Sequence, residues 1–154
     1  MATKEITTGY VAQIILAEDN PADVVLVRMA LQEAGLDCEL HVMADGEKTI
    51  SFIEELDARP TALFLDLLLL DMHLPKRDGE AVLRRLRSTE NFAQTPVIVM
   101  TASDAPRDHA QAEKHAALHY FRKPSNLDGY MQLGVIIRDL LFPKAAAAVQ
   151  GPLA

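Results

Sequence analysis

The fold of this chain is decided by the stretch Ala62-Leu-Phe-Leu-Asp-Leu-Leu-Leu-Leu-Asp71 and by the turn-forming residues Met72-His73-Leu74-Pro75-Lys76 that follow it. A short apolar run bounded by turn residues predicts a buried β-strand, and this strand ends at Asp71. A carboxylate is costly where a buried strand reaches the surface, unless it is paired, coordinated or reactive. The position of Asp71 therefore indicates a functional site at the end of this strand.

Composition narrows the class of protein. The chain has 154 residues, of which 49% are apolar and 24% charged, as is typical of one globular domain. The net charge of −7 argues against a nucleic-acid-binding surface, which needs clustered Lys and Arg. Cys38 is the single cysteine, so no intramolecular disulfide can form. Because no apolar run approaches the ~20 residues of a membrane span, and the N-terminus lacks a signal region, we expect a cytoplasmic protein without membrane contact.

Apolar runs alternate with amphipathic segments along the chain. Strands are predicted over residues 12–17 and 38–43, in a third run ending at residue 71, and over 96–101 and 118–121. Helices are predicted over residues 21–34, to 57 after a cap at Asp45, to 88 after Asp78, from Asp104 and Pro106 to 117, and from a cap at Ser125 to 142. Five such repeats predict an α/β fold, a parallel sheet with helices on both faces. We assign residues 1–10 to an N-terminal extension, 11–143 to the domain and 144–154 to a disordered tail.

Three other strands end in residues that suit the same site as Asp71. The first strand is followed by Glu18 and Asp19, the fourth ends at Thr101, and Lys123 follows the fifth. Ligands of open α/β sheets bind beyond the carboxyl ends of the strands, so these residues should be neighbours. Three close carboxylates cannot all stay ionised without a cation. The oxygen-rich set predicts a site for Mg²⁺, or Mn²⁺ in its place, with the backbone carbonyl of His73 as a further ligand.

A carboxylate surrounded by a metal ion, a lysine and a hydroxyl can accept a phosphoryl group. Catalysis of this transfer is mostly positioning and neutralisation of charge, which Lys123 and the Thr101 hydroxyl would assist. The sequence contains neither common glycine-rich nucleotide-binding motif. We therefore expect the phosphoryl donor to be another protein or a small phosphodonor.

The motifs Glu-Asp, Asp-(x)₃-Pro, Thr-Ala-Ser and Lys-Pro occur in this order within residues 12–142 and resemble the response-regulator receiver domains of two-component signalling. The resemblance implies a flavodoxin-like receiver fold with strand order 2-1-3-4-5, in a signalling protein that is not an enzyme. Matched by position, it implies specific roles for six residues: phosphoacceptor Asp71, metal-binding pair Glu18 and Asp19, switch hydroxyl Thr101, invariant lysine Lys123 and aromatic switch residue Tyr120.

The motif Leu-Pro-Lys-Arg-Asp-Gly and the short length are most similar to the single-domain regulators paired with bacterial phytochrome histidine kinases. This narrower resemblance implies a sensor histidine kinase as partner, specifically a bacteriophytochrome. Output would then be protein–protein contact or onward phosphotransfer, through the face formed by the fourth helix, fifth strand and fifth helix.

Alternatives exist for both the nucleophile and the function. Asp66 is the rival nucleophile, but it lies about 16 Å before Asp71 at ~3.3 Å per residue, toward the other edge of the sheet. An aspartyl-nucleophile, phosphatase-like hydrolase is the alternative function. The common pattern of such enzymes has a second acid two residues after the nucleophile, where this chain has His73. The His73 side chain either faces the phosphoryl group or is an ordinary loop histidine.

The last predicted helix is apolar around most of its circumference, whereas covering one sheet face needs an apolar stripe of only roughly 100°. The surplus predicts a second burial partner, either a second copy of the chain or the alanine-rich tail. Regulators of this family commonly dimerise through the fourth helix, fifth strand and fifth helix. The expected homodimer interface comprises Tyr130, Leu133, Ile137, Leu140 and Leu141.

Overall fold

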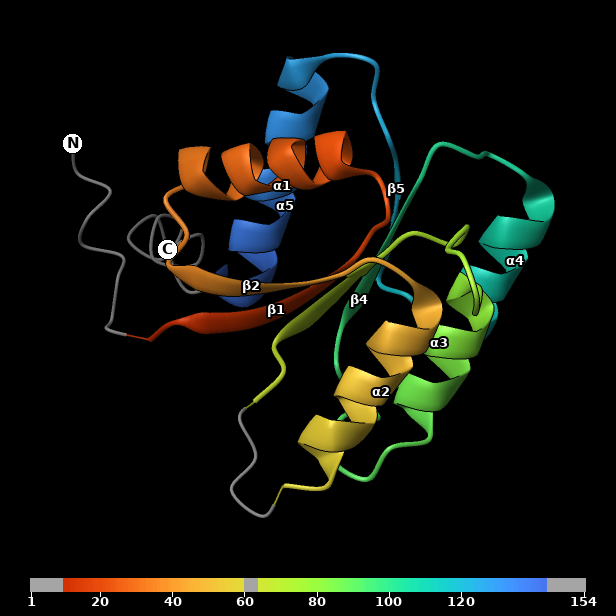
Figure 1. Ribbon diagram of the computed structural model, residues 1–154. Coiled ribbons are helices and arrows are strands. Elements are labelled where there is room, and N and C mark those ends of the chain that lie inside the picture. Colours follow the sequence, from red (N-terminus) through yellow and green to blue (C-terminus); the bar gives the residue numbers. More distant parts are fainter. Residues whose placement is uncertain (1–9, 60–63, 144–154) are drawn as a thin grey trace, which may run out of the picture.

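Five parallel strands form the centre of the molecule in the computed structural model, which describes residues 10–59 and 64–143 (Figure 1). The strands are β1 (Ala12–Ala17), β2 (Cys38–Met43), β3 (Leu67–Leu70), β4 (Val97–Thr101) and β5 (His119–Arg122). Their order in the sheet is β2-β1-β3-β4-β5, and all four neighbouring pairs are parallel. The predicted fold class and strand order are confirmed. The predicted disordered tail and most of the predicted extension lie outside the described residues.

Helices cover both faces of the sheet (Figure 1). They are α1 (Pro21–Glu33), α2 (Gly46–Asp57), α3 (Gly79–Arg87), α4 (Pro106–Lys114) and α5 (Leu127–Leu141). Alternate residues of β3 point to opposite faces, so Leu67 and Leu69 pack in the core beneath α1 and α5, while Leu68 and Leu70 pack beneath α2, α3 and α4. Burial on both faces explains why the strand is a continuous apolar run in the sequence. Among the described residues, no helix combines the length and apolar character needed to cross a membrane.

Side-chain caps set the start of four helices. Asn20, Asp45 and Asp78 accept hydrogen bonds from backbone N–H groups in the first turns of α1, α2 and α3. The last helix is capped by Asn126, whose Oδ1 accepts from the N–H of Gly129 at 2.7 Å, and not by Ser125 as predicted. An amide oxygen satisfies the same free N–H groups as a hydroxyl, so Asn126 can serve in place of the predicted Ser125.

The fourth helix begins at Pro106, one of the two residues predicted to open it, but it ends at Lys114 and not at residue 117 as predicted. Ala105 occupies the N-cap position of α4 and makes no side-chain hydrogen bond. The carboxylate of Asp104 instead contacts Nε2 of His109 at 2.8 Å and the Arg122 guanidinium at 3.7 Å. The helix ends at Lys114 because Ala116 adopts a left-handed conformation, with φ of 59°. The other predicted bounds agree with the observed ones to within one residue.

Candidate functional site

The sheet itself holds the predicted site residues where its strands end. The backbone N–H of Asp71 donates to the carbonyl of Ala17 at 3.0 Å, so pairing with β1 continues one residue beyond β3. In the same way the N–H of Glu18 donates to Met43, and that of Lys123 to Thr101. Four strands thus deliver their terminal residues to one edge of the sheet, as the rule for parallel sheets predicts.

Three carboxylates gather at this edge. Glu18, Asp19 and Asp71 each offer an oxygen atom within 4.8 Å of the others. Glu18 and Asp71 are buried and Asp19 is exposed. Burial raises the pKa of Glu18, because an ionised carboxylate loses solvation there. A set of oxygen ligands around an exposed opening suits a hard divalent cation such as Mg²⁺, which keeps several of its waters.

Lys123 places a positive charge beside these carboxylates. Its Nζ lies 2.7 Å from Oε1 of Glu18 and 2.9 Å from Oδ2 of both Asp71 and Asp23. Burial alone would lower the pKa of Lys123, but the hydrogen bonds to Glu18, Asp23 and Asp71 outweigh it and raise this pKa. The ammonium group therefore stays charged throughout the neutral pH range. Asp23 was not among the predicted site residues, and its only sequence signal is its position in the helical turn after Glu18 and Asp19.

A tight loop after β3 contacts the second oxygen of Asp71. Oδ1 of Asp71 accepts a hydrogen bond from the N–H of His73 at 2.8 Å. The loop can approach α3 closely because residue 79 is glycine: a Cβ atom there would lie 2.5 Å from Cα of Met72 and 3.1 Å from the carbonyl oxygen of Asp71. The metal-ligand role of the His73 carbonyl stays a prediction.

The His73 side chain contacts α4. Its Nε2 lies 2.6 Å from Oδ2 of Asp108, a buried residue in the first turn of that helix. Whether His73 affects the phosphoryl group or is an ordinary loop histidine stays a prediction. The histidine connects the loop after β3 with α4.

Thr101 and Tyr120 meet at one loop residue. The buried hydroxyl of Thr101 accepts a hydrogen bond from the N–H of Ser103 at 3.2 Å. The Tyr120 hydroxyl donates to the carbonyl of the same Ser103 at 2.9 Å. The Tyr120 ring is stacked on His109, with 3.6 Å between the ring centroids. The two predicted switch residues are therefore joined through the loop between β4 and α4.

Asp66 lies at the opposite end of the strands from the site, where β3 begins, as predicted. Its carboxylate accepts hydrogen bonds from the N–H of Gln13 at 2.7 Å and from the Tyr10 hydroxyl, and its own N–H donates to the Gln13 carbonyl. Asp66 thereby satisfies the backbone at the start of β1, and it has no part in the acidic cluster.

Part of the predicted dimer interface is wrong. Tyr130, Leu133 and Ile137 are only 2%, 0% and 0% exposed, because they pack against the sheet within the same chain. The surplus apolar surface of α5 is covered by α1, which packs so closely that a Cβ at Gly134 would lie 2.2 Å from the Ala30 carbonyl oxygen. Leu140 and Leu141 are partly buried against the same core.

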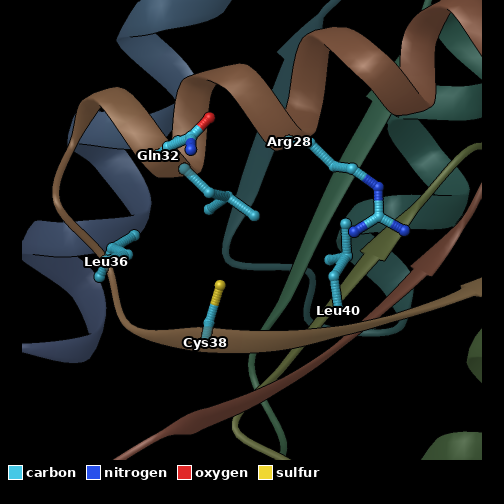
Figure 2. Close-up of a pocket in the computed structure, with 6 residues that line it drawn as sticks. Arg28, Gln32, Leu36, Cys38 and Leu40 are labelled. Atoms are coloured by element: carbon cyan, nitrogen blue, oxygen red, sulfur yellow. The ribbon is translucent and has the colours of Figure 1, made fainter.

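Two cavities differ in their relation to this site. One of about 510 Å³ borders the acidic cluster and is lined by Asp19, the loop after β3 and the first turns of α4. Another of about 300 Å³ lies between α1 and β2, where Cys38 points toward the helix beside Arg28 and Leu40 (Figure 2). Burial raises the pKa of the Cys38 thiol, so this cavity contains no activated nucleophile.

The family model of the response regulator receiver domain matches residues 14–133, which include the whole acidic cluster and Lys123. The chain belongs to this family. Receiver domains of response regulators are phosphorylated on an aspartate by histidine kinases. This chain is a receiver domain of that kind.

Individual relatives are also regulators. Response regulator Rcp1 of Synechocystis sp. is 32% identical over 114 residues, covering 74% of this chain and 78% of Rcp1. Its manganese-bound structure has a TM-score of 0.72 at 29% identity and covers 83% of this chain and 92% of that one. The phosphorylated cyanobacterial phytochrome response regulator RcpA has a TM-score of 0.76 at 28% identity, with 86% and 95% covered. The bacteriophytochrome response regulator RtBRR has a TM-score of 0.69 at 28% identity, and the match covers 85% of this chain and 78% of that one. These relatives give the hydrolase alternative no support.

Proposed function

We propose that Asp71 is the aspartate on which this receiver domain accepts its phosphoryl group. The main support is the position of Asp71. It belongs to the acidic cluster, accepts a hydrogen bond from Lys123 and accepts another from the backbone of the loop after β3. Glu18 also contacts Lys123, but its side chain is only 1% exposed, so a donor cannot reach it. Asp19 is exposed but makes no contact with Lys123 among the described ion pairs.

The chemistry follows from this arrangement. An Asp71 oxygen attacks the phosphorus of a phosphohistidine, the P–N bond breaks, and the imidazole nitrogen takes a proton as it leaves. Mg²⁺ held by Glu18, Asp19 and Asp71, or Mn²⁺ in its place, would neutralise charge on the phosphoryl oxygens. Lys123 supplies a further fixed positive charge, and the Thr101 hydroxyl can turn to donate to a phosphoryl oxygen.

The same contacts offer a route for output. Because Thr101 and Tyr120 both bind Ser103, a movement of Thr101 toward the phosphoryl group displaces the loop that holds Tyr120. This would change the face formed by α4, β5 and α5, as expected when a local change of charge biases a two-state element.

The partner we propose is a sensor histidine kinase of the bacteriophytochrome type. The likeness to RcpA and RtBRR, regulators named for phytochromes, supports this choice. We also propose a homodimer through α4, β5 and α5. It is supported by the edge position of β5 and by Leu118, which is 52% exposed beside it. A cytoplasmic location and the lack of nucleic-acid binding stay predictions.

The nucleophile is tested by incubating the protein with acetyl phosphate and Mg²⁺ and measuring the intact mass. We expect one phosphoryl group on the wild type and on the control Asp66→Asn, and none on Asp71→Asn or after chelation of the metal. Phosphoryl addition to Asp71→Asn would contradict the assignment, and turnover of phosphomonoesters would favour a hydrolase. Light scattering on the same samples tests the dimer: Leu118→Glu should reduce the mass to that of one chain, while Val25→Glu on α1 should not.

A further inference from the structure

The carboxylate of Asp23 connects Lys123 to a tyrosine that the proposed phosphotransfer does not use. Asp23 lies in the first turn of α1, and its Oδ2 accepts a hydrogen bond from Lys123 Nζ at 2.9 Å. Its other oxygen, Oδ1, accepts from the Tyr130 hydroxyl of α5, also at 2.9 Å. The first turns of α1 and α5 are thus joined to the residue that follows β5.

These contacts are shielded from solvent. The side chains of Lys123 and Asp23 are 11% and 16% exposed, and Tyr130 is 2% exposed. Hydrogen bonds to an ionised group are stronger than neutral ones, and shielding from water preserves them. Burial and the bond to Asp23 raise the pKa of Tyr130, so its hydroxyl remains a donor.

Asp23 differs from the other two partners of Lys123. Glu18 and Asp71 belong to the acidic cluster that suits a cation, whereas Asp23 does not. In the proposed reaction the Asp71 carboxylate becomes an acyl phosphate, and both cluster residues acquire a metal ion as partner. Asp23 is therefore the one described partner of Lys123 whose bonding the reaction leaves unchanged.

We infer that Asp23 is a positioning residue, held by the Tyr130 hydroxyl, which keeps the Lys123 ammonium beside Asp71 while Asp71 changes from carboxylate to acyl phosphate. The consequence for phosphotransfer rests on the proposed function of Asp71 and Lys123. The restraint on Lys123 itself does not.

The kinetic test compares Asp23→Asn and Tyr130→Phe with the wild type. At saturating Mg²⁺ and acetyl phosphate, we expect the rate of phosphoryl addition to fall about tenfold in Asp23→Asn and about threefold in Tyr130→Phe, from the loss of charge-assisted hydrogen bonds. The double variant should fall no further than Asp23→Asn, because the tyrosine acts through the aspartate. The Kd for Mg²⁺, measured by calorimetry, should stay unchanged, since Asp23 lies outside the acidic cluster.

The chain offers a matched control in a second tyrosine–aspartate pair at the far edge of the sheet. Tyr10→Phe and Asp66→Asn remove a tyrosine–aspartate hydrogen bond there, in a more exposed setting, and should leave the rate unchanged. Effects of Asp23→Asn and Tyr130→Phe that match these controls, or that add in the double variant, would overturn the inference. So would a parallel loss of Mg²⁺ affinity, which would indicate a general disturbance of the site.

A second readout needs no phosphotransfer. In the NMR spectrum of the lysine ammonium groups, Lys123 should exchange its protons with water slowly in the wild type and at least about tenfold faster in Asp23→Asn. Unchanged exchange would overturn the inference even if Asp71 is the phosphoacceptor. If the wild type accepts no phosphoryl group, the proposed function fails, and this measurement still decides whether Asp23 holds Lys123.

Discussion

Substitutions at two glycines should distinguish the effect of backbone strain on stability from the effect of a displaced loop on the site. Gly79 is required by close approach to Met72 and Asp71, whereas Gly35 has a φ of +72° and a Cβ added there would meet nothing within 4 Å. Alanine at Gly35 should lower the free energy of unfolding by about 1 kcal/mol through backbone strain. Alanine at Gly79 should lower it by about 1–3 kcal/mol and displace the loop that carries Asp71.

We expect Gly79→Ala to weaken Mg²⁺ binding and Gly35→Ala to leave it unchanged. Urea unfolding measures the free energy of unfolding for both variants, and calorimetric titration measures their affinity for Mg²⁺. Equal Mg²⁺ affinities in two comparably destabilised variants would show that the close approach at Gly79 does not position Asp71.

Helix α4 is held in part by a contact outside itself. It has no side-chain cap, and its buried Asp108 is bonded to His73 in the loop after Asp71. Removing the histidine leaves this carboxylate buried without its partner, which is unfavourable. His73→Ala should therefore accelerate hydrogen exchange in the first turns of α4 about tenfold, with α2 unchanged.

Hydrogen exchange followed by mass spectrometry resolves the two helices, and His119→Ala, an exposed change in β5, provides the control. Unchanged protection of α4 in His73→Ala would mean that this contact does not hold the helix. The proposed link between the Asp71 loop and the α4 face would then run through Thr101 and Ser103 alone.

At the scale of the whole molecule, its three tyrosines share one response to alkaline pH. Burial and the hydrogen bond to Asp66 raise the pKa of Tyr10 to about 12, and burial also raises the pKa values of Tyr120 and Tyr130. A pKa that is higher in the folded state favours folding while the group is protonated. This contribution is complete below the ordinary value of 10.0 and is lost as pH rises through the folded-state values.

We therefore expect little tyrosinate absorbance from the folded protein at pH 10, and a free energy of unfolding that declines as pH rises above 10. Urea unfolding across this range measures the decline, which should be smaller in Tyr10→Phe. Half-complete tyrosine ionisation in the folded protein at pH 10 would contradict the prediction.

The sequence alone determined the alternation of strands and helices, the parallel sheet and the gathering of Glu18, Asp19 and Asp71 at one edge. Each of these follows from a pattern within one element, combined with the rule that parallel strands end on the same side. The cap of the last helix was predicted one residue too early, at Ser125, because the adjacent Asn126 can accept the same hydrogen bond.

Only the tertiary structure decided which elements share a surface. Asp23 meets Lys123 across 100 positions of sequence and Tyr130 across 107. Packing of α5 against the sheet and α1 buries Tyr130, Leu133 and Ile137, which the apolar pattern of the helix had assigned to a dimer. Apolar periodicity shows that a helix face is buried, but it does not name the partner, because the hydrophobic effect is non-directional. The partner of α5 is α1, because both helices lie on the same face of the sheet.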